Sequence, residues 1–285
     1  MAGSPAVLVG VVLLFGLLVG SFLNVVIHRV PIMLDREWRA QAEELAGREP
    51  AKSEPYNLVV PRSACPSCQA PITALQNIPV VSWLALRGKC ANCGAGISAR
   101  YPLVELLTGL MSAAVAWKFG FGWPLLAALV LTWFLVALTF IDLDTQLLPD
   151  SLTLPLLWIG LVLSLWAGDA GGAAVPVETR TAVIGAAAGY LSLWSVYWLF
   201  KLTTGKEGMG YGDFKLLAAL GAWLGWTVIP QVVLVSSVLG ALGGILMIMV
   251  RGRDRAVPIP FGPWLAGAGA LALFYGSAIN ALYLR

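Results

Sequence analysis

Charged residues are scarce in this chain: only 12% of its 285 residues are Asp, Glu, Lys or Arg, whereas 59% are hydrophobic. A soluble domain of this composition could not cover its surface with polar groups, so the sequence predicts an all-α polytopic membrane protein whose main partner is the lipid bilayer, not nucleic acid. Crossing roughly 30 Å of hydrocarbon takes about 20 apolar helical residues. By this rule we expect about eight transmembrane helices, near residues 6–27, 102–118, 123–141, 152–168, 180–200, 214–227, 229–250 and 260–282. The second and the sixth are the weakest, and a protein with seven spans would lack one of them.

Basic residues are nearly absent from one side of this predicted topology. With an N-terminus outside, the cytoplasmic segments are 28–101, 142–151, 201–213 and 251–259. Fifteen of the eighteen basic residues lie in these segments or at the same face of the membrane. The other three are Lys118, Arg180 and Arg285. This bias follows the positive-inside rule and places both termini outside. No basic residue precedes the first helix, so we interpret it as a permanent span instead of a cleaved signal peptide.

Cysteine is rare as well, and all four cysteines lie in the first cytoplasmic segment. They form two C-x-x-C pairs separated by 21 residues: Cys65, Cys68, Cys90 and Cys93. Two such turns can complete a tetrahedral shell of four thiolates, which zinc favours. Two disulfides are the competing interpretation, but this side of the membrane is reducing. A closed shell has no position for a reacting water, so we expect a structural zinc ion.

These features predict a domain organisation. We expect a first transmembrane helix (1–27), a cytoplasmic domain (28–101) with a small zinc-knuckle module (62–96), and a membrane-embedded domain (102–285).

The near-absence of histidine restricts the catalytic chemistry. The only histidine, His28, lies next to Arg29 at the end of the first helix, where an interfacial role is the simpler interpretation. No H-E-x-x-H motif is present, which argues against a zincin-type protease. No G-x-G-x-x-G motif opens a dinucleotide-binding unit either. Carboxylates remain as the candidate catalytic groups.

Three acidic residues at membrane boundaries are candidates for such a role. Asp142 and Asp144 end the third predicted helix, and Asp213 begins the sixth, so both segments reach the cytoplasmic face. Ionisable groups at such positions usually face a partner or a water-filled cavity. Two carboxylates that share a proton can activate water and polarise a peptide carbonyl. The residues alone leave open whether Asp142 or Asp144 pairs with Asp213.

The neighbouring residues allow two further interpretations. Gly208, Gly210 and Gly212 precede Asp213 and would let the backbone lie close to an extended substrate. Asp150 is best interpreted as the N-cap of the fourth helix, and Asp213 could also be a helix cap.

Together these residues resemble the type IV prepilin peptidases, the bifunctional leader peptidases and N-methyltransferases of bacterial pilus and type II secretion systems. The motifs that carry the resemblance are 20–24 with His28 and Arg29, the paired C-x-x-C loop, 100–105, Asp142 with 148–150, 208–215 and 258–263. The G-x-G-D core is also similar to that of presenilin-like intramembrane proteases, which lack the cysteine loop.

The resemblance implies specific roles. It assigns the catalytic pair to Asp142 and Asp213. It implies that the basic leader of prepilins and pseudopilins is cut after a glycine at the cytoplasmic face of the bacterial inner membrane. S-adenosylmethionine would then methylate the new N-terminal residue, commonly phenylalanine. Glu105 fits the motif pattern, but the resemblance assigns it no chemical role.

The site of methyl transfer and two alternative functions stay open. Gly88 and Lys89, beside the second cysteine pair, are candidate cofactor-binding residues because they offer a close backbone approach and a cation. One alternative is a peptidase without methyltransferase activity. The other is a membrane transporter or assembly factor whose cytoplasmic loop is stabilised by a zinc ion and whose aspartates relay protons.

Overall fold

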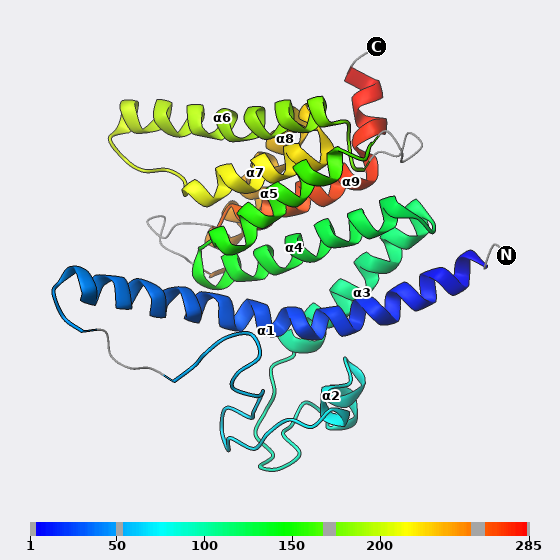
Figure 1. The fold of residues 1–285 in the computed structure, drawn as a ribbon, viewed down its shortest axis with the longest axis vertical. Coiled ribbons are helices and arrows are strands. Elements are labelled where there is room, and N and C mark those ends of the chain that lie inside the picture. The colour runs from blue at the N-terminus through cyan, green and yellow to red at the C-terminus, as the bar shows by residue number, and fades with distance from the viewer. Residues whose placement is uncertain (1–3, 50–53, 168–174, 252–259, 284–285) are drawn as a thin grey trace. The chain divides into compact units, whose positions relative to one another are not determined.

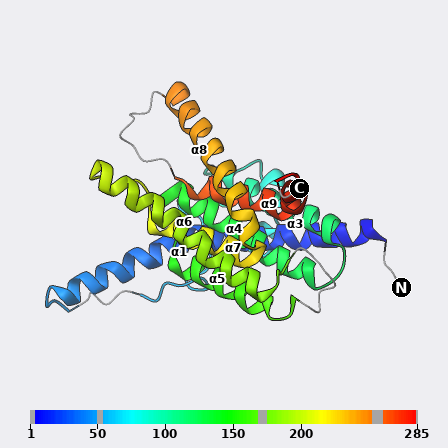
Figure 2. The ribbon, with the colours of Figure 1, turned by 90° about the horizontal axis from the view of Figure 1, so that it is seen from above.

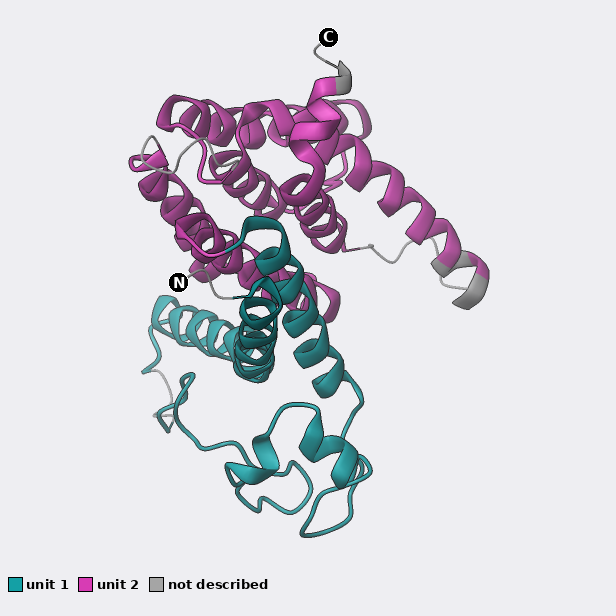
Figure 3. Cartoon of the chain, turned by 90° about the vertical axis from the view of Figure 1, so that its right-hand side faces the viewer, with its two compact units in different colours: residues 1–120 teal, residues 121–285 magenta. Residues whose placement is uncertain are grey.

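The structure is a computed structural model that describes residues 4–49, 54–167, 175–251 and 260–283. Within these ranges the chain is helical, and its only β-type pairing is two isolated bridges. Residues 252–259 of the last predicted cytoplasmic segment, including 258 and 259 of the final motif, lie outside the described residues. The chain divides into two compact units, Met1–Gly120 and Phe121–Arg285, which are coloured separately in Figure 3.

The first unit contains two long helices that pack together, α1 (Pro5–Leu45) and α3 (Arg100–Phe119). Small residues permit their close approach: a β-carbon on Gly20 would lie only 2.7 Å from the Cα of Glu105. Between them the chain forms a short 3-10 helix, η1 (Leu75–Asn77), and a five-residue helix, α2 (Val81–Ala85).

Helix α1 continues well beyond residue 27, where we expected its apolar part to end, although Pro31 lies within it. The guanidinium of the buried residue Arg29 donates hydrogen bonds to the carbonyl oxygens of Asn57 (2.8 Å) and Pro61 (2.6 Å). Further along, Arg36 lies over the Tyr56 ring, 4.3 Å from its centroid. These contacts bring the returning chain back along the polar half of α1.

The second unit is a helical bundle built around a short central helix (Figures 1 and 2). Its elements are α4 (Trp123–Thr145), α5 (Asp150–Ser164), α6 (Thr179–Thr204), α7 (Tyr211–Leu224), η3 (Trp226–Val228), α8 (Ile229–Arg251) and α9 (Gly262–Tyr283). Helix α7 packs against α5, α6 and α9, and every residue from Asp213 to Leu224 except Lys215 is buried. A β-carbon on Gly185 of α6 or on Gly221 of α7 would collide with the backbone of the other helix, so these two helices touch directly.

The all-α membrane class is confirmed, and a helix is found at each of the eight expected positions. In the described part of the chain, six helices are long and apolar enough to cross a membrane: α1, α3, α4, α6, α8 (with the preceding η3) and α9. The other two, α5 and α7, have only 15 and 14 residues. The expected count of about eight spans therefore stays approximate: all eight helices are present, but α5 ends at Ser164 and α7 ends before Gly225, so both are shorter than a full span.

Candidate active site and metal centre

Asp142 lies in the last turn of α4, and only 5% of its surface is exposed. Its Oδ2 accepts a hydrogen bond of 2.9 Å from the backbone N–H of Gly262, the first residue of α9. The first N–H groups of a helix have no partner within the helix and carry partial positive charge, so a carboxylate suits this position. The contact fixes the orientation of Asp142 by joining segments 120 positions apart.

Asp213 occupies the first turn of α7 and is also buried, with 7% of its surface exposed. It lies close enough to Asp142 for the two carboxyl groups to interact electrostatically, and the backbone of Gly210 contacts its carboxylate. The structure therefore brings together the two aspartates that the resemblance paired. Asp144 lies on the exposed side of the same turn of α4.

The glycine run before Asp213 fits closely against its surroundings. A β-carbon on Gly212 would lie 2.7 Å from Cβ of Leu148, and one on Gly208 would lie 2.8 Å from the Phe200 ring. Gly210 is the N-cap residue of α7 and has more room. The run thus brings the backbone close to its neighbours, and its role towards a substrate stays a prediction.

An ion pair fastens this loop to the end of α6. The Lys201 ammonium donates hydrogen bonds to Oε1 of Glu207 (2.8 Å) and to the hydroxyl of Tyr197 (3.1 Å). The hydrogen bond from Lys201 lowers the pKa of the exposed Glu207 carboxyl below its usual value. The sequence contained no motif that would have identified this pair.

Asp150 does not cap α5 with its side chain, so our interpretation of it as an N-cap is wrong. The N-cap residue is Pro149, and Asp150 is the first helical residue without a capping hydrogen bond. Its Oδ2 instead accepts a hydrogen bond of 2.7 Å from Lys215 of α7. This ion pair joins the starts of α5 and α7, and Lys215 is two residues from Asp213.

The four cysteine thiols form one compact cluster, with all four Sγ atoms within 4.8 Å of one another. The Sγ atoms of Cys65 and Cys93 are 3.8 Å apart, and those of Cys68 and Cys90 are 4.0 Å apart. A tetrahedral zinc site with Zn–S bonds of about 2.3 Å has sulfur–sulfur edges of about 3.8 Å. All four cysteines are free thiols. The geometry therefore fits a zinc ion and not the competing pair of disulfides.

The two halves of this cluster repeat the same backbone turn. The Cys65 N–H donates to the Ala70 carbonyl and the Cys65 carbonyl accepts from Gln69. The second pair repeats both bonds, from Cys90 to Ala95 and from Gly94 to Cys90. Each turn is closed by one of the two isolated bridges, and its fifth residue has a positive φ angle, 59° at Gln69 and 72° at Gly94.

Local hydrogen bonds favour the thiolate form of two cysteines. The Asn92 side-chain amide donates to Sγ of Cys68 at 3.5 Å, and this bond, with the backbone of Ala70, lowers the Cys68 pKa to about 6. Backbone amides of Cys93 and Asn92 likewise lower the Cys90 pKa. Because zinc binds the thiolate, these donors suit a metal site.

Gly88 and Lys89, the candidate cofactor residues, lie beside the second turn. Gly88 has a φ angle of 66°, and a β-carbon there would lie 2.8 Å from the Trp83 ring. The Trp83 indole N–H in turn donates to the Ile97 carbonyl at 3.1 Å. Gly88 is thus needed for packing, while Lys89 is exposed.

Glu105, to which the sequence assigned no chemistry, is a buried anchor in the first unit. Its Oε2 accepts a hydrogen bond of 2.7 Å from the backbone N–H of Val80, a residue with a φ angle of 61°. Asn24 of α1 donates from its side chain to the Tyr101 carbonyl at 3.1 Å. Polar residues of two motifs therefore hold the loop before α2 and the start of α3, whereas His28 is exposed.

Comparison with known proteins places these features in a family. Residues 14–119 match the family model described as the bacterial Peptidase A24 N-terminal domain, and residues 129–245 match the type IV leader peptidase family. A protein of Aeromonas hydrophila named prepilin leader peptidase/N-methyltransferase is 61% identical, with the alignment covering 99% of this chain and 96% of the relative. A Pseudomonas aeruginosa protein of the same name is 54% identical over 100% of this chain and 96% of its own length. The comparison with solved structures gave no significant match. From the two family matches and these full-length relatives, the chain is a multi-pass membrane protein of the type IV leader peptidase family.

Proposed function

We propose that this chain is a prepilin leader peptidase and N-methyltransferase of the bacterial inner membrane. Its substrates would be prepilins and pseudopilins, whose basic leader it removes. The observation that carries the proposal is that Asp142 and Asp213, two buried carboxyl groups of one unit, lie close enough to interact electrostatically. Full-length similarity to relatives named for both activities supports it.

In the proposed peptidase reaction the two aspartates share one proton. The ionised carboxylate takes a proton from water as the water oxygen bonds to the peptide carbon, while the protonated carboxyl donates to the carbonyl oxygen. The C–N bond then breaks, and a proton passes to the leaving amine. The Gly262 N–H holds one oxygen of Asp142 and leaves the other for water or substrate.

We propose that Cys65, Cys68, Cys90 and Cys93 hold one structural Zn²⁺ ion, because two sulfur pairs are 3.8 and 4.0 Å apart and all four sulfur atoms lie within 4.8 Å of one another. The ion would fix the two turns relative to each other and take no part in hydrolysis.

S-adenosylmethionine would supply the methyl group for the second reaction. Lys89 stays a candidate for binding it, because its ammonium group is exposed beside the cysteine turns, whereas Trp83 already occupies the space next to Gly88. We also propose that residues 28–101, with the zinc module at 62–96, face the cytoplasm between the first span (1–27) and the membrane-embedded domain (102–285). Both termini would then be periplasmic, consistent with the distribution of basic residues.

The test uses purified wild type, Asp142→Asn and Asp213→Asn with a prepilin in detergent, and Asp144→Asn as the matched control from the same turn. Leader cleavage and methyl transfer to precleaved substrate are followed separately. We expect Asp142→Asn and Asp213→Asn to lose cleavage but keep methyl transfer, and Asp144→Asn to keep both. Normal cleavage by both dyad variants would refute the aspartyl mechanism. Absence of methyl transfer by wild type would leave a peptidase alone.

A further inference from the structure

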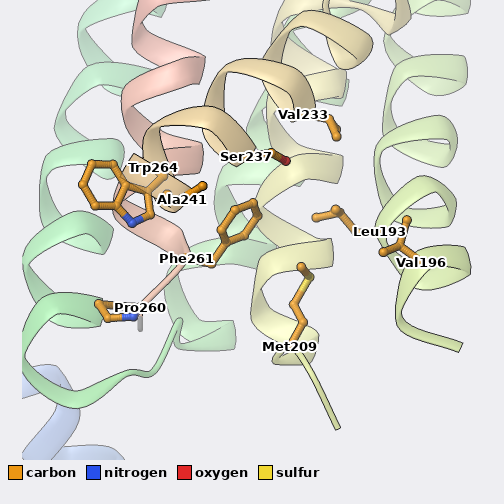
Figure 4. Close-up of a pocket in the computed structure, with 10 residues that line it drawn as sticks. Leu193, Val196, Met209, Val233, Ser237, Ala241, Pro260, Phe261 and Trp264 are labelled. Atoms are coloured by element: carbon orange, nitrogen blue, oxygen red, sulfur yellow. The ribbon is translucent and has the colours of Figure 1, made fainter. Parts of the chain in front are cut away.

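An apolar cavity of ≈ 370 Å³ lies in the second unit, next to the two segments that contact the aspartates (Figure 4). Three elements and one loop line it. The lining residues are Leu193 and Val196 of α6, Met209 of the glycine run, Val233, Ser237, Gly240 and Ala241 of α8, and Pro260, Phe261 and Trp264 at the start of α9. None of these residues is charged, and their polar side-chain groups are the Ser237 hydroxyl and the Trp264 indole N–H.

Two walls of the cavity continue directly into the candidate active site. Phe261 immediately precedes Gly262, whose N–H binds the Asp142 carboxylate. Met209 immediately precedes Gly210, whose backbone contacts the Asp213 carboxylate. Two residues that line the cavity are therefore sequence neighbours of the two glycines whose backbones contact the aspartates.

The opposite side of the cavity is bordered by exposed apolar residues of α6 and α8. Val196 is 54% exposed, and Ser237 and Ala241 are exposed as well. Beyond them, Leu234 and Val238 of α8 continue the apolar surface with 57% and 50% exposure. An exposed apolar surface on helices of membrane-spanning length suits hydrocarbon, and a membrane-embedded segment would then reach the cavity sideways between α6 and α8.

From this arrangement we infer that the cavity is the subsite for a large apolar side chain of the substrate, next to the bond that is cut. The inference rests on the proposed peptidase function and adds a specificity determinant to it. The cavity has room for a bulky aliphatic or aromatic side chain, and its uncharged lining favours an apolar one. A charged side chain would lose its hydration in this lining without gaining a partner, and a small side chain would leave part of the cavity empty. Both weaken binding. The basic leader, in contrast, finds no complementary charge in this lining.

The test compares substrates that differ only in the residue after the scissile bond, which is Ala, Phe or Trp. The Ala241→Phe variant narrows the cavity from an exposed position of α8, and Phe261→Ala widens it by removing a central ring (Figure 4). We expect Ala241→Phe to lower the ratio of kcat/KM for the Phe substrate to that for the Ala substrate by roughly 10-fold or more. Phe261→Ala should raise the relative rate for the Trp substrate. A misfolded enzyme could not produce that gain.

Ala278→Phe is the matched control, because Ala278 is exposed on α9 and 14 positions from Trp264. It should leave both ratios within about 2-fold of wild type. Unchanged ratios in Ala241→Phe and Phe261→Ala, with normal cleavage, would overturn the subsite alone and favour a lipid acyl chain as its occupant. Failure of wild type to cut any of the substrates would instead refute the proposed function, and the subsite with it.

Discussion

Replacing Gly262 by alanine should move the Asp142 carboxylate without removing it. A β-carbon at this position would lie 2.7 Å from Oδ2 of Asp142 and 3.1 Å from Cδ2 of Leu148. Ordinary contact begins at 3.4 Å, so the carboxylate must withdraw by the difference, about 0.7 Å. Misplacement of a catalytic group by 1 Å costs on the order of 100-fold in rate. We therefore expect kcat for leader cleavage to fall by roughly 10- to 100-fold, or about 1.4–2.7 kcal/mol of activation free energy.

The assay is steady-state cleavage of a purified prepilin, with methyl transfer to precleaved substrate as an internal reference. Methyl transfer should be unchanged, because it does not require the aspartates in the proposed function. Gly267→Ala is the control, since Gly267 lies on the same helix and a β-carbon there has nothing within 4 Å. If Gly262→Ala cuts within about threefold of wild type while folded, the contact between α9 and Asp142 does not orient the carboxylate.

Three further predictions concern the other polar contacts. Wild type should contain one zinc ion per chain by atomic absorption, and Cys68→Ser should lose it and unfold at lower temperature; equal zinc content in both would refute the metal site. In a double-mutant cycle of Asp150→Asn and Lys215→Met, thermal unfolding should give a coupling of at most about 1 kcal/mol, because the side chains are 56% and 26% exposed. A coupling well above this value would mean that water does not screen the pair. Lys201 lowers the pKa of Glu207 below its usual value of 4.5, so the ion pair stabilises the fold fully above pH 4.5. This stabilisation is lost as the pH falls through the lowered pKa of Glu207. Glu207→Gln should therefore abolish this part of the acid dependence of unfolding, and an unchanged profile would contradict it.

Local sequence patterns were sufficient for the helices and the cysteine cluster. Apolar runs mark all eight main helices, because a helix in hydrocarbon must be apolar over most of its length. The four thiols come together as expected because each C-x-x-C turn is a local structure that needs only a matching second turn. The length of the runs was a poorer guide, since α5 and α7 end early.

Contacts between distant segments could not be predicted in the same way. The hydrogen bond from Gly262 to Asp142 joins positions 120 apart, and no local pattern connects them. Asp150 follows a local rule for helix caps, but Lys215, 65 positions later, provides a stronger partner for its charge. Neither partner can be recognised until the helices are packed.

The short length of α7 bears on how a reaction that consumes water can occur among hydrocarbon chains. With 14 residues α7 is about 21 Å long, whereas its neighbour α6, with 26 residues, is about 39 Å long. Part of the length alongside α6 is therefore left to the irregular chain that precedes α7, and Asp213 lies where α7 begins. Irregular backbone at such a depth is tolerated when protein surrounds it or when it borders water. In the proposed peptidase reaction, the short helix would leave room at its start for water and an extended peptide beside Asp213.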